Sequence, residues 1–228
     1  MAMPCDNVKI RAWLSALIRA ARLRPVKSGM ELEVRMRVSA EFFLRVLTWF
    51  SKAYAHVNTV VTDDFFYTVK GQAVRTSRTI APPLTLSHVI KTRLASEDVT
   101  VEPSAGQESL KKGIDYCDLR VSLNEEKGVP CTLPVGVDAD LIRRKERTTF
   151  MFHKFWKLDA TKVYSGSTLA QVEHKQQHGE CEYELELECV DLETMLSEKT
   201  DDYIAEDAML KSTALFSFGS FVSSRGGK

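Results

Sequence analysis

The sequence predicts an α+β fold: a closed antiparallel eight-stranded β-barrel with helices packed around it. Three observations lead to this expectation. Eight segments have strand character and are separated by turn-forming stretches such as Lys70-Gly71 and Pro82-Pro83. Several of these segments alternate ionic and apolar residues, which gives each strand one charged and one apolar face. Amphipathic helical stretches flank the first strand and follow the last.

The chain has the size of one large domain. Its 228 residues are 44% hydrophobic, which is enough to bury a sizeable core. The 31 basic residues balance the 31 acidic ones, so a polyanionic ligand would need a local cluster of positive charge. We expect residues 1–24 to form an N-terminal helix packed on the barrel, residues 25–222 to form the main domain and residues 223–228 to form a flexible tail.

Cysteine content and hydropathy bound the cellular setting. Five cysteines without a C-x-x-C spacing favour a reduced intracellular protein over a disulfide or zinc framework. No apolar run of the sequence is long enough to span a bilayer, and we expect no membrane association.

The predicted N-terminal helix has an apolar stripe between Ile10 and Ala21, with basic residues outside it. Pro25 ends this helix. Residues 8–24 contain arginines and no acids, which also resembles a mitochondrial presequence, so a targeting role stays open.

A strand and a second helix follow. Residues 31–38 alternate strictly, with charged residues on one face and apolar residues on the other. Ser39 can cap the next helix, whose aromatic residues recur at helical spacing and are interpreted as core.

The middle of the chain is rich in β-structure. Candidate strands cover residues 57–69, 72–80, 87–95, 116–124, 142–152 and 155–164. Residues 96–111 are predicted to form an exposed loop, and residues 165–180 a polar excursion before the last strand. Helical runs follow between Asp191 and Leu215. Short strands at close spacing favour a closed antiparallel sheet over βαβ units.

The last predicted strand, residues 182–188, has a glutamate at every second position: Glu182, Glu184, Glu186 and Glu188. A strand places all four on one face and the intervening tyrosine and leucines on the other. A helix would spread them around its circumference and leave no apolar face. Carboxylates at that spacing raise one another's pKa unless basic side chains or metal ions lie among them.

Other strands carry basic residues at alternate positions. The shared faces are Arg143, Lys145, Arg147 and Thr149; Lys157, Asp159 and Thr161; Arg120, Ser122, Asn124 and Glu126; Arg75 with Ser77; and Lys91 with Arg93. For one strand alone, a solvated outer face would explain the pattern. Across so many strands, the opposite faces would have to form the core, yet they include Glu146, Lys162 and Asp118. We therefore expect the charged faces to line the lumen of the barrel, with apolar faces outside.

A lumen of this kind suits the hydrolysis of triphosphates. Carboxylates at alternate positions bind hard divalent cations such as Mg²⁺ or Mn²⁺ through oxygen. Facing lysines and arginines can hold a chain of phosphates. Phosphoryl transfer depends mainly on a metal at the terminal phosphate, fixed positive charge and a positioned water.

The pattern resembles the triphosphate tunnel metalloenzymes, specifically the RNA 5′-triphosphatases of fungal and protozoan mRNA capping systems. The resemblance covers residues 30–192 and rests on the order of four motifs: Glu31-Leu32-Glu33-Val34-Arg35, Lys145-x-Arg147, Asp159-x-Thr161 and Glu184-Leu185-Glu186-Leu187-Glu188. It implies the triphosphate tunnel fold and a metal-dependent polynucleotide 5′-phosphatase. Such an enzyme releases the γ-phosphate of nascent RNA 5′ ends, the first step of cap formation, and also hydrolyses nucleoside triphosphates.

The resemblance also implies roles for individual residues. Glu31, Glu33, Glu186 and Glu188 would hold the Mg²⁺ or Mn²⁺, with Glu184 beside them. Lys145 and Arg147 would contact the γ-phosphate, together with Arg75 and with Lys91 or Arg93. Glu126 resembles the carboxylate that orients the attacking water, with its neighbour Glu125 as the alternative. The remaining substrate-binding residues would be Arg35, Arg120, Lys157, Asp159 and Thr161.

Two positions depart from the family pattern, and one glutamate is additional to it. Lys157 stands where an arginine is expected, which removes or moves a bidentate contact. Arg35 stands where much of the wider superfamily has lysine. Neither departure removes a metal ligand, so activity is expected to persist. Glu182 is surplus to the pattern, and we expect it near the tunnel mouth, where its loss should matter least.

The sequence leaves several alternatives open. The protein could cleave inorganic tripolyphosphate or thiamine triphosphate, serve as a non-catalytic polyphosphate-binding module, or be a β-sandwich interaction protein. If the protein is an RNA triphosphatase of mRNA capping, the expected partners are triphosphate-ended RNA, nucleoside triphosphates and a guanylyltransferase. The expected compartment is then the nucleus. A monomer is favoured weakly over a homodimer. The Gln-rich setting of His174 and His178 favours an exposed loop over a zinc site.

Overall fold

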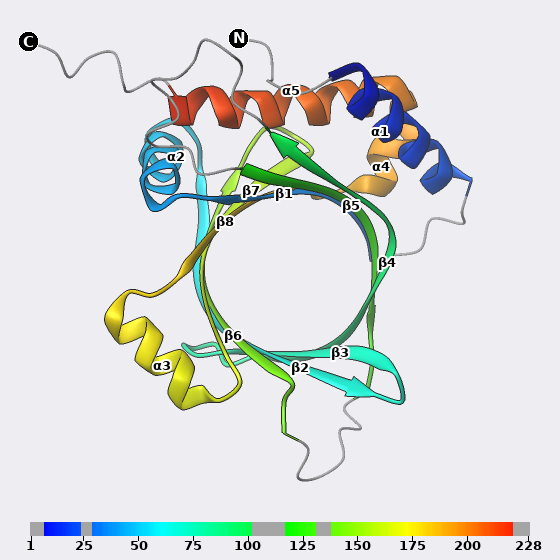
Figure 1. Cartoon of the computed structure of the whole chain (residues 1–228). Helices are drawn as coiled ribbons and strands as arrows, with labels where there is room; N and C mark the ends of the chain where they lie inside the picture. Colours follow the sequence, from blue (N-terminus) through cyan, green and yellow to red (C-terminus); the bar gives the residue numbers. More distant parts are fainter. Residues whose placement is uncertain (1–6, 24–28, 102–116, 131–137, 221–228) are drawn as a thin grey trace, which may run out of the picture.

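The computed structural model describes residues 7–23, 29–101, 117–130 and 138–220. Its centre is a closed barrel with the strand order β1-β5-β4-β3-β2-β6-β7-β8, and every neighbouring pair is antiparallel (Figure 1). The strands are β1 (Met30–Val38), β2 (His56–Val69), β3 (Gln72–Thr79), β4 (Leu86–Val101), β5 (Cys117–Gly128), β6 (Leu141–Met151), β7 (Trp156–Gly166) and β8 (Glu182–Cys189). The predicted eight-stranded antiparallel barrel is confirmed.

The helices cover the barrel unevenly. They are α1 (Asn7–Arg22), α2 (Ala40–Ala53), α3 (Leu169–His178), α4 (Leu192–Glu198) and α5 (Asp201–Ser220). All except α3 lie over β1, β5, β7 and β8, which we call the upper wall (Figure 1). Helix α3 lies against β6 and β7. We call β2, β3 and β6 the lower wall. Within the described residues, we find no helix with the length and hydropathy that a bilayer crossing needs.

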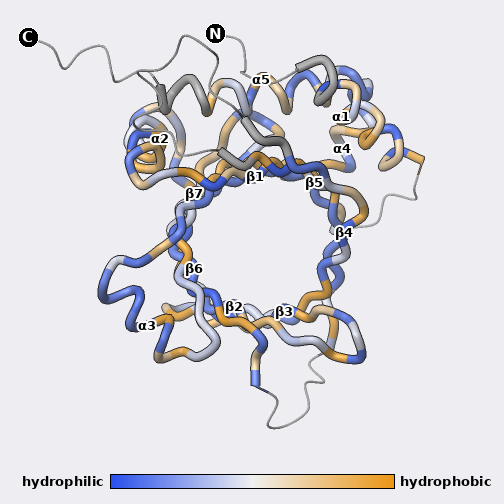
Figure 2. Tube along the Cα trace, in the orientation of Figure 1, coloured by the Kyte–Doolittle hydropathy of each residue, from blue (hydrophilic) through white to orange (hydrophobic). Residues whose placement is uncertain are grey.

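The main hydrophobic core lies between the upper wall and its helices. Along these strands apolar and polar residues alternate (Figure 2), and the apolar ones face the helices. Leu185 and Leu187 of β8 are fully buried in the same cluster as Phe43 and Phe50 of α2. Helix α2 begins as predicted, because the Ser39 hydroxyl accepts a hydrogen bond of 3.2 Å from the Phe42 amide.

The outer face of the lower wall is partly ionic, which differs from the apolar outer face that we expected. Beside the ionic part, Phe65 and Ile142 pack in a small apolar cluster with Val172 of α3. Asp63 of β2 is fully buried and accepts hydrogen bonds of 2.8 and 3.1 Å from Arg144 of β6. Arg78 of β3 donates another, of 3.0 Å. Asp63 is the register partner of both arginines, so one carboxylate joins three strands from outside. Around Asp63, ion pairs thus hold the strands together on the outside, where the upper wall has apolar packing.

Two predicted irregular segments are regular structure. Strand β4 continues through residues 96–101, because its register with β5 is unbroken there and Asp98 pairs with Arg120. Residues 102–111 of the predicted loop and the predicted tail at 223–228 lie outside the described residues.

The predicted polar excursion contains helix α3, so the prediction that His174 lies in a loop was wrong. The Thr168 side chain caps the start of α3, and Gly179 ends it in the left-handed conformation at φ 70°. These two capping signals outweigh the polar composition on which the loop prediction rested.

Candidate functional site

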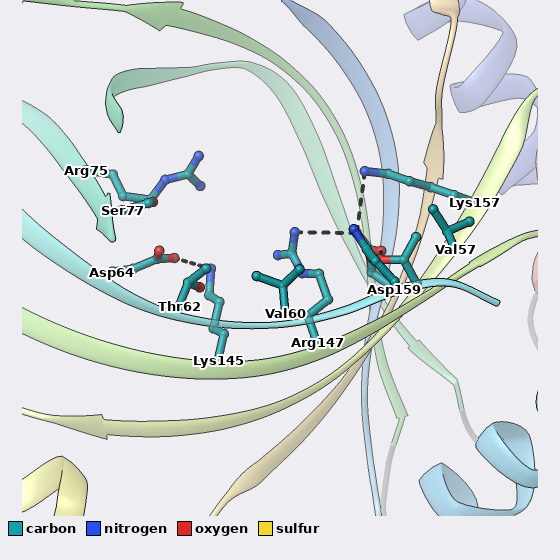
Figure 3. Close-up of a pocket in the computed structure, with 12 residues that line it drawn as sticks. Val57, Val60, Thr62, Asp64, Arg75, Ser77, Lys145, Arg147, Lys157 and Asp159 are labelled. Carbon is teal, nitrogen blue, oxygen red and sulfur yellow. Dashed lines mark hydrogen bonds and ion pairs between the residues drawn. The ribbon is translucent and has the colours of Figure 1, made fainter. Parts of the chain in front are cut away.

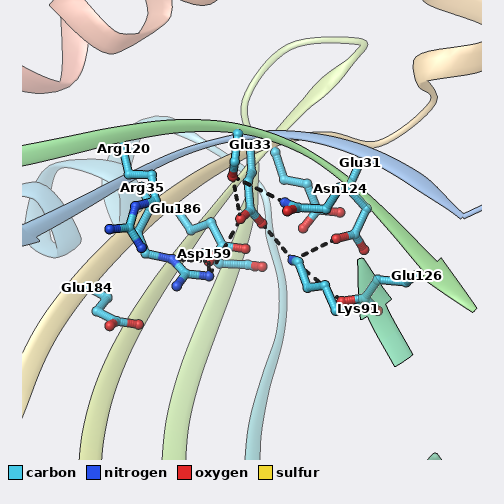
Figure 4. Close-up of polar contacts among 12 residues, drawn as sticks. Glu31, Glu33, Arg35, Lys91, Arg120, Asn124, Glu126, Asp159, Glu184 and Glu186 are labelled. Atoms are coloured by element: carbon cyan, nitrogen blue, oxygen red, sulfur yellow. Dashed lines mark hydrogen bonds and ion pairs between the residues drawn. The ribbon is translucent and has the colours of Figure 1, made fainter. Parts of the chain in front are cut away.

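The lumen of the barrel collects the charged faces of its strands, and two close-up views show its opposite sides. Figure 4 shows acidic residues of the upper wall with the basic residues that reach them. Figure 3 shows a pocket of about 430 Å³ lined mainly by the lower wall. Acids and bases therefore face each other across one cavity, as the alternation predicted.

An acidic patch forms where β7, β8 and β1 lie side by side. We define it by five residues: Glu31, Glu33, Asp159, Glu186 and Glu188. Register partners across the strands bring these carboxylates together, since Glu33 pairs with Glu188 and Glu186 pairs with Asp159. Asp159, Glu186 and Glu188 each offer a ligand atom, and these atoms lie within 4.8 Å of one another.

Basic side chains reach into the acidic patch from neighbouring strands. Lys91 Nζ of β4 donates to Glu31 at 2.9 Å and to Glu33 at 3.0 Å. The Ser122 hydroxyl of β5 donates to the second oxygen of Glu33 at 2.8 Å. Two further ion pairs are Arg35 with Glu186 at 2.9 Å and Lys157 with Glu188 at 3.1 Å. These contacts offset part of the repulsion among the carboxylates.

The pKa values within the patch diverge. Burial, reinforced by Glu31 and Glu186, raises the pKa of Glu188 to about 7 although Lys157 opposes this. Burial also raises the pKa of Glu31. Glu186 is buried as well, but Arg35 and Arg147 overcome that cost and hold its pKa at about 2. The negative charge of Glu31 and Glu188 is therefore only partly compensated, and an added cation would stabilise their ionised forms.

The donor set fits a hard divalent cation. It consists of carboxylate oxygens, the ligands that Mg²⁺ and Mn²⁺ prefer. Asp159 Oδ2 is buried and has no hydrogen-bond partner among the described residues, and two cations lie near it, Arg147 and Lys157, each at 3.5 Å. A carboxylate oxygen in this setting can still accept a further ligand.

The lower wall supplies buried cations. Lys145 Nζ contacts Asp64 Oδ2 at 2.6 Å, and burial lowers the pKa of Lys145 although Asp64 opposes this (Figure 3). Arg75 and Arg147 also line the pocket, and the Nε atom of each is buried and finds no hydrogen-bond partner in the part of the chain that the structure describes. Unused donors inside a polar cavity are suited to an anionic ligand.

Glu126 is the glutamate that enters the lumen. Its two carboxylate oxygens each accept from Arg75 Nη2 at 3.1 Å, and Lys91 Nζ lies 3.5 Å away. Glu126 pairs in register with Lys91, and the alternation of β5 turns the adjacent Glu125 to the other face.

Gly29 holds the backbone of Glu126 in place. The amide of Glu126 donates to the Gly29 carbonyl at 2.7 Å. Gly29 has φ 102°, and a Cβ there would collide with the Glu126 carbonyl oxygen.

The remaining predicted residues lie apart from the acidic patch. Glu184 accepts a hydrogen bond of 2.8 Å from Arg143 and is not in the group of three carboxylates that could share a metal. Arg120 forms a two-point contact with Asp98 at 2.6 and 3.0 Å. Arg93 pairs in register with Asn124 and is exposed, and Thr161 is buried beside Glu184.

The sequence analysis missed Asp64 as a lumen residue. Asp63 and Asp64 are adjacent, so alternation alone does not tell which of them faces inward. Pairing resolves this, because Asp64 is opposite Ser77 of β3 and Arg143 of β6, which both belong to charged faces. The signal was therefore present in the neighbouring strands.

Comparison with known proteins identifies the fold and the family. The S. pombe RNA triphosphatase Pct1 superposes with a TM-score of 0.61 at 16% identity, over 95% of this chain and 91% of that one. The mimivirus capping enzyme triphosphatase superposes with a TM-score of 0.64 at 14% identity, over 95% of this chain and 100% of that one. No curated protein sequence matches the chain. The sequence model of the family "mRNA capping enzyme, beta chain" matches residues 52–213, which is more than half of the chain. The chain therefore belongs to the mRNA capping enzyme beta chain family, and its barrel is a triphosphate tunnel of the RNA triphosphatase type.

Proposed function

We propose that the protein is a metal-dependent RNA 5′-triphosphatase that removes the γ-phosphate from nascent RNA 5′ ends, the first step of cap formation. The observation that carries this proposal is the closed lumen in which an acidic patch faces buried Lys145 and the partly buried Arg75 and Arg147. A triphosphate has the charge and the length to lie between them. Membership in the capping family favours RNA as the natural substrate. Nucleoside triphosphates present the same phosphates and should be hydrolysed too.

In this proposal, Glu31, Glu33, Glu186 and Glu188 hold Mg²⁺ or Mn²⁺, and Asp159 lies beside them. The bound ion would neutralise charge on the terminal phosphate. Glu184 instead braces Arg143, since the two are already joined by a short ion pair. The proposed ligands are therefore the four predicted glutamates, and Glu184 is not proposed to support the metal.

The basic side chains bind and orient the phosphates. Lys145 and Arg147 lie on adjacent inward positions of β6 and contact the γ-phosphate. Arg75 and Lys91 approach from β3 and β4. Fixed positive charge in a buried cavity stabilises the negative charge that develops as the bond to the leaving β-phosphate oxygen breaks.

Glu126 positions the attacking water. Its carboxylate is held by Arg75 and lies near Lys91, so its orientation is set by two groups that also bind phosphate. The water attacks the γ-phosphorus, its proton passes to solvent or to a phosphate oxygen, and the products are orthophosphate and a diphosphate-ended RNA.

A phosphate-release assay tests the proposal. Wild type and Glu33→Gln are compared on triphosphate-ended RNA, ATP, tripolyphosphate and thiamine triphosphate, with and without Mn²⁺. We expect manganese-dependent release from RNA, and a loss of at least about 100-fold in Glu33→Gln. Glu41→Gln is the matched control, because Glu41 is an exposed acid on α2 that pairs with Arg45 outside the barrel. Equal rates for wild type and Glu33→Gln would contradict the assignment of Glu33 to the metal site.

The same assay separates the alternatives. Turnover of tripolyphosphate or thiamine triphosphate without turnover of RNA would identify a different tunnel phosphatase. Tight binding of triphosphate without turnover of any substrate would identify a binding module.

We also propose the nucleus as compartment and a guanylyltransferase as partner. Both follow from the capping role, and one structure of Pct1 is a complex with the Spt5 CTD. Co-purification of the protein with a guanylyltransferase from nuclear extract tests both.

A further inference from the structure

A second cavity opens in the lumen beside the acidic patch. It has a volume of about 270 Å³ and is lined by Arg35, Arg37, Asp98 and Arg120. We call it the arginine pocket. Three of these four lining residues are arginines, and Arg35 and Arg37 also form ion pairs with glutamates of β1 and β8. The resemblance implies that Arg35 and Arg120 bind substrate, but the proposed hydrolysis of the terminal phosphate does not say which part of the substrate they contact.

The arginine pocket lies at one end of the tunnel. Arg35 and Arg37 follow Glu33 along β1 toward the end of that strand at Val38, and Arg120 lies near the start of β5. The acidic patch lies on the other side of this pocket along β1. From Glu33 to Arg37 the strand covers about 13 Å, given the rise of a strand per residue.

Arg35 connects the acidic patch to the arginine pocket. Its guanidinium contacts Glu186 at 2.9 Å and lies 3.7 Å from Glu33, while its side chain also lines the arginine pocket. A polyanion whose terminal phosphate lies at the acidic patch can therefore continue into the arginine pocket without leaving the lumen.

The arginines differ in how tightly they are held. Arg120 makes a two-point contact with Asp98. Arg37 is 64% exposed, and its ion pairs with Glu182 and Glu184 are longer, at 3.6 Å and 3.9 Å. Its side chain is therefore accessible to a ligand at this end of the tunnel.

We propose that the arginine pocket binds the phosphodiester backbone that follows the 5′-triphosphate of the RNA. Arginine is suited to this task, because its planar fork contacts phosphate oxygens at two points and carries no preference for base sequence. The pocket would thus distinguish RNA from free nucleoside triphosphates and tripolyphosphate, which have no phosphodiester. The inference rests on the proposed function and adds the direction of entry: RNA extends from the mouth at which β1 ends.

Substrate length tests the inference. KM is measured for GTP, for a triphosphate-ended dinucleotide and for longer triphosphate-ended RNA, at low and at moderate salt. We expect KM to be about five-fold lower for RNA than for GTP, to reach its plateau within the first nucleotides and to rise with salt. In Arg37→Gln the ratio of the KM for GTP to the KM for RNA should fall toward one. The salt dependence of the KM for RNA should weaken by about one phosphate contact.

Two further variants make the test decisive. Arg37→Glu, at the same exposed position, should raise KM for RNA above that for GTP. Arg11→Gln is the matched control, since Arg11 is a half-exposed arginine on α1 that pairs with Glu206 outside the barrel. Lys154→Gln probes the opposite mouth, where this exposed lysine lies in the turn between β6 and β7.

Hydrolysis of RNA with a KM ratio that does not respond to either Arg37 variant would overturn the inference and leave the proposed function intact. A ratio that responds to Lys154→Gln instead would also overturn it, because the RNA would then leave by the opposite mouth. Absence of any RNA hydrolysis by the wild type would overturn the proposed function, and the inference with it.

Discussion

The upper and lower walls of the barrel present charged faces to the lumen and opposite kinds of face to the outside. Behind Glu186 and Glu188 of the upper wall lie Leu185 and Leu187, which are fully buried under the helices. Behind Lys145 of the lower wall lies Arg144, which pairs with buried Asp63. The wall that carries the mutually repelling carboxylates is thus the wall anchored by the main apolar core, which can offset that repulsion.

The largest expected effect tests whether the two walls divide the chemistry between metal and phosphate. Arg147→Gln on the lower wall should lower kcat on RNA by about 1,000-fold, because a cation in the lumen at the γ-phosphate is lost. Its affinity for Mn²⁺, measured by calorimetry, should stay unchanged or increase, because Arg147 is a positive charge close to Asp159. Glu33→Gln is the counterpart and should weaken Mn²⁺ binding. Equal loss of Mn²⁺ affinity in both variants would show that the walls are not specialised.

The next effect tests the apolar anchor of the upper wall. Leu187→Ala should lower the free energy of unfolding by about 3 kcal/mol, because a fully buried side chain between barrel and helices is truncated. Urea denaturation measures this. Leu84→Ala is the matched control, since Leu84 is 72% exposed in the turn between β3 and β4 and its truncation should change little. Similar losses in the two variants would contradict the assignment of the main core to the upper wall.

The contrast between the walls also explains what the sequence could reveal. On β1 and β8, leucines and valines alternate with charges, so the inward face and the acidic patch could be predicted. On β6 the series Lys145, Arg147 and Thr149 still indicated the inward face. On β2 the adjacent Asp63 and Asp64 place charge on both faces, and alternation cannot tell which of them points inward. Asp64 was missed for this reason.

Other features depend on contacts that no single segment encodes. Glu126 is distinguished from Glu125 only by the register of β5 against β4 and by the turn at Gly29. The separation of Glu184 from the acidic patch follows from its contact with Arg143 of β6, a strand far away in the sequence.

The ionic outer face of the lower wall provides a smaller effect. Asp63→Ala should lower the free energy of unfolding by about 2 kcal/mol, because buried Arg144 would lose its partner while half-exposed Arg78 would regain water. The double variant Asp63→Ala/Arg144→Met should recover part of this loss, as apolar groups replace both charges. A double variant less stable than Asp63→Ala would show that Arg144 contributes mainly through other contacts, such as its hydrogen bond to Gln176 of α3.

The smallest effect concerns Glu182, the first glutamate of β8 and the outermost of the four on its lumen face. Its side chain is 52% exposed, and its contact with Arg37 is loose at 3.6 Å, so solvent screens most of its charge. Glu182→Gln should therefore change kcat on ATP by less than about two-fold. Glu188 lies on the same strand face, six residues further along β8, and the same substitution there should abolish most turnover. Steady-state kinetics of the two variants at saturating Mn²⁺ measures the gradient along one strand face. Equal losses would mean that the acidic function of β8 extends to the tunnel mouth and is not confined to the part of the upper wall that meets β1 and β7.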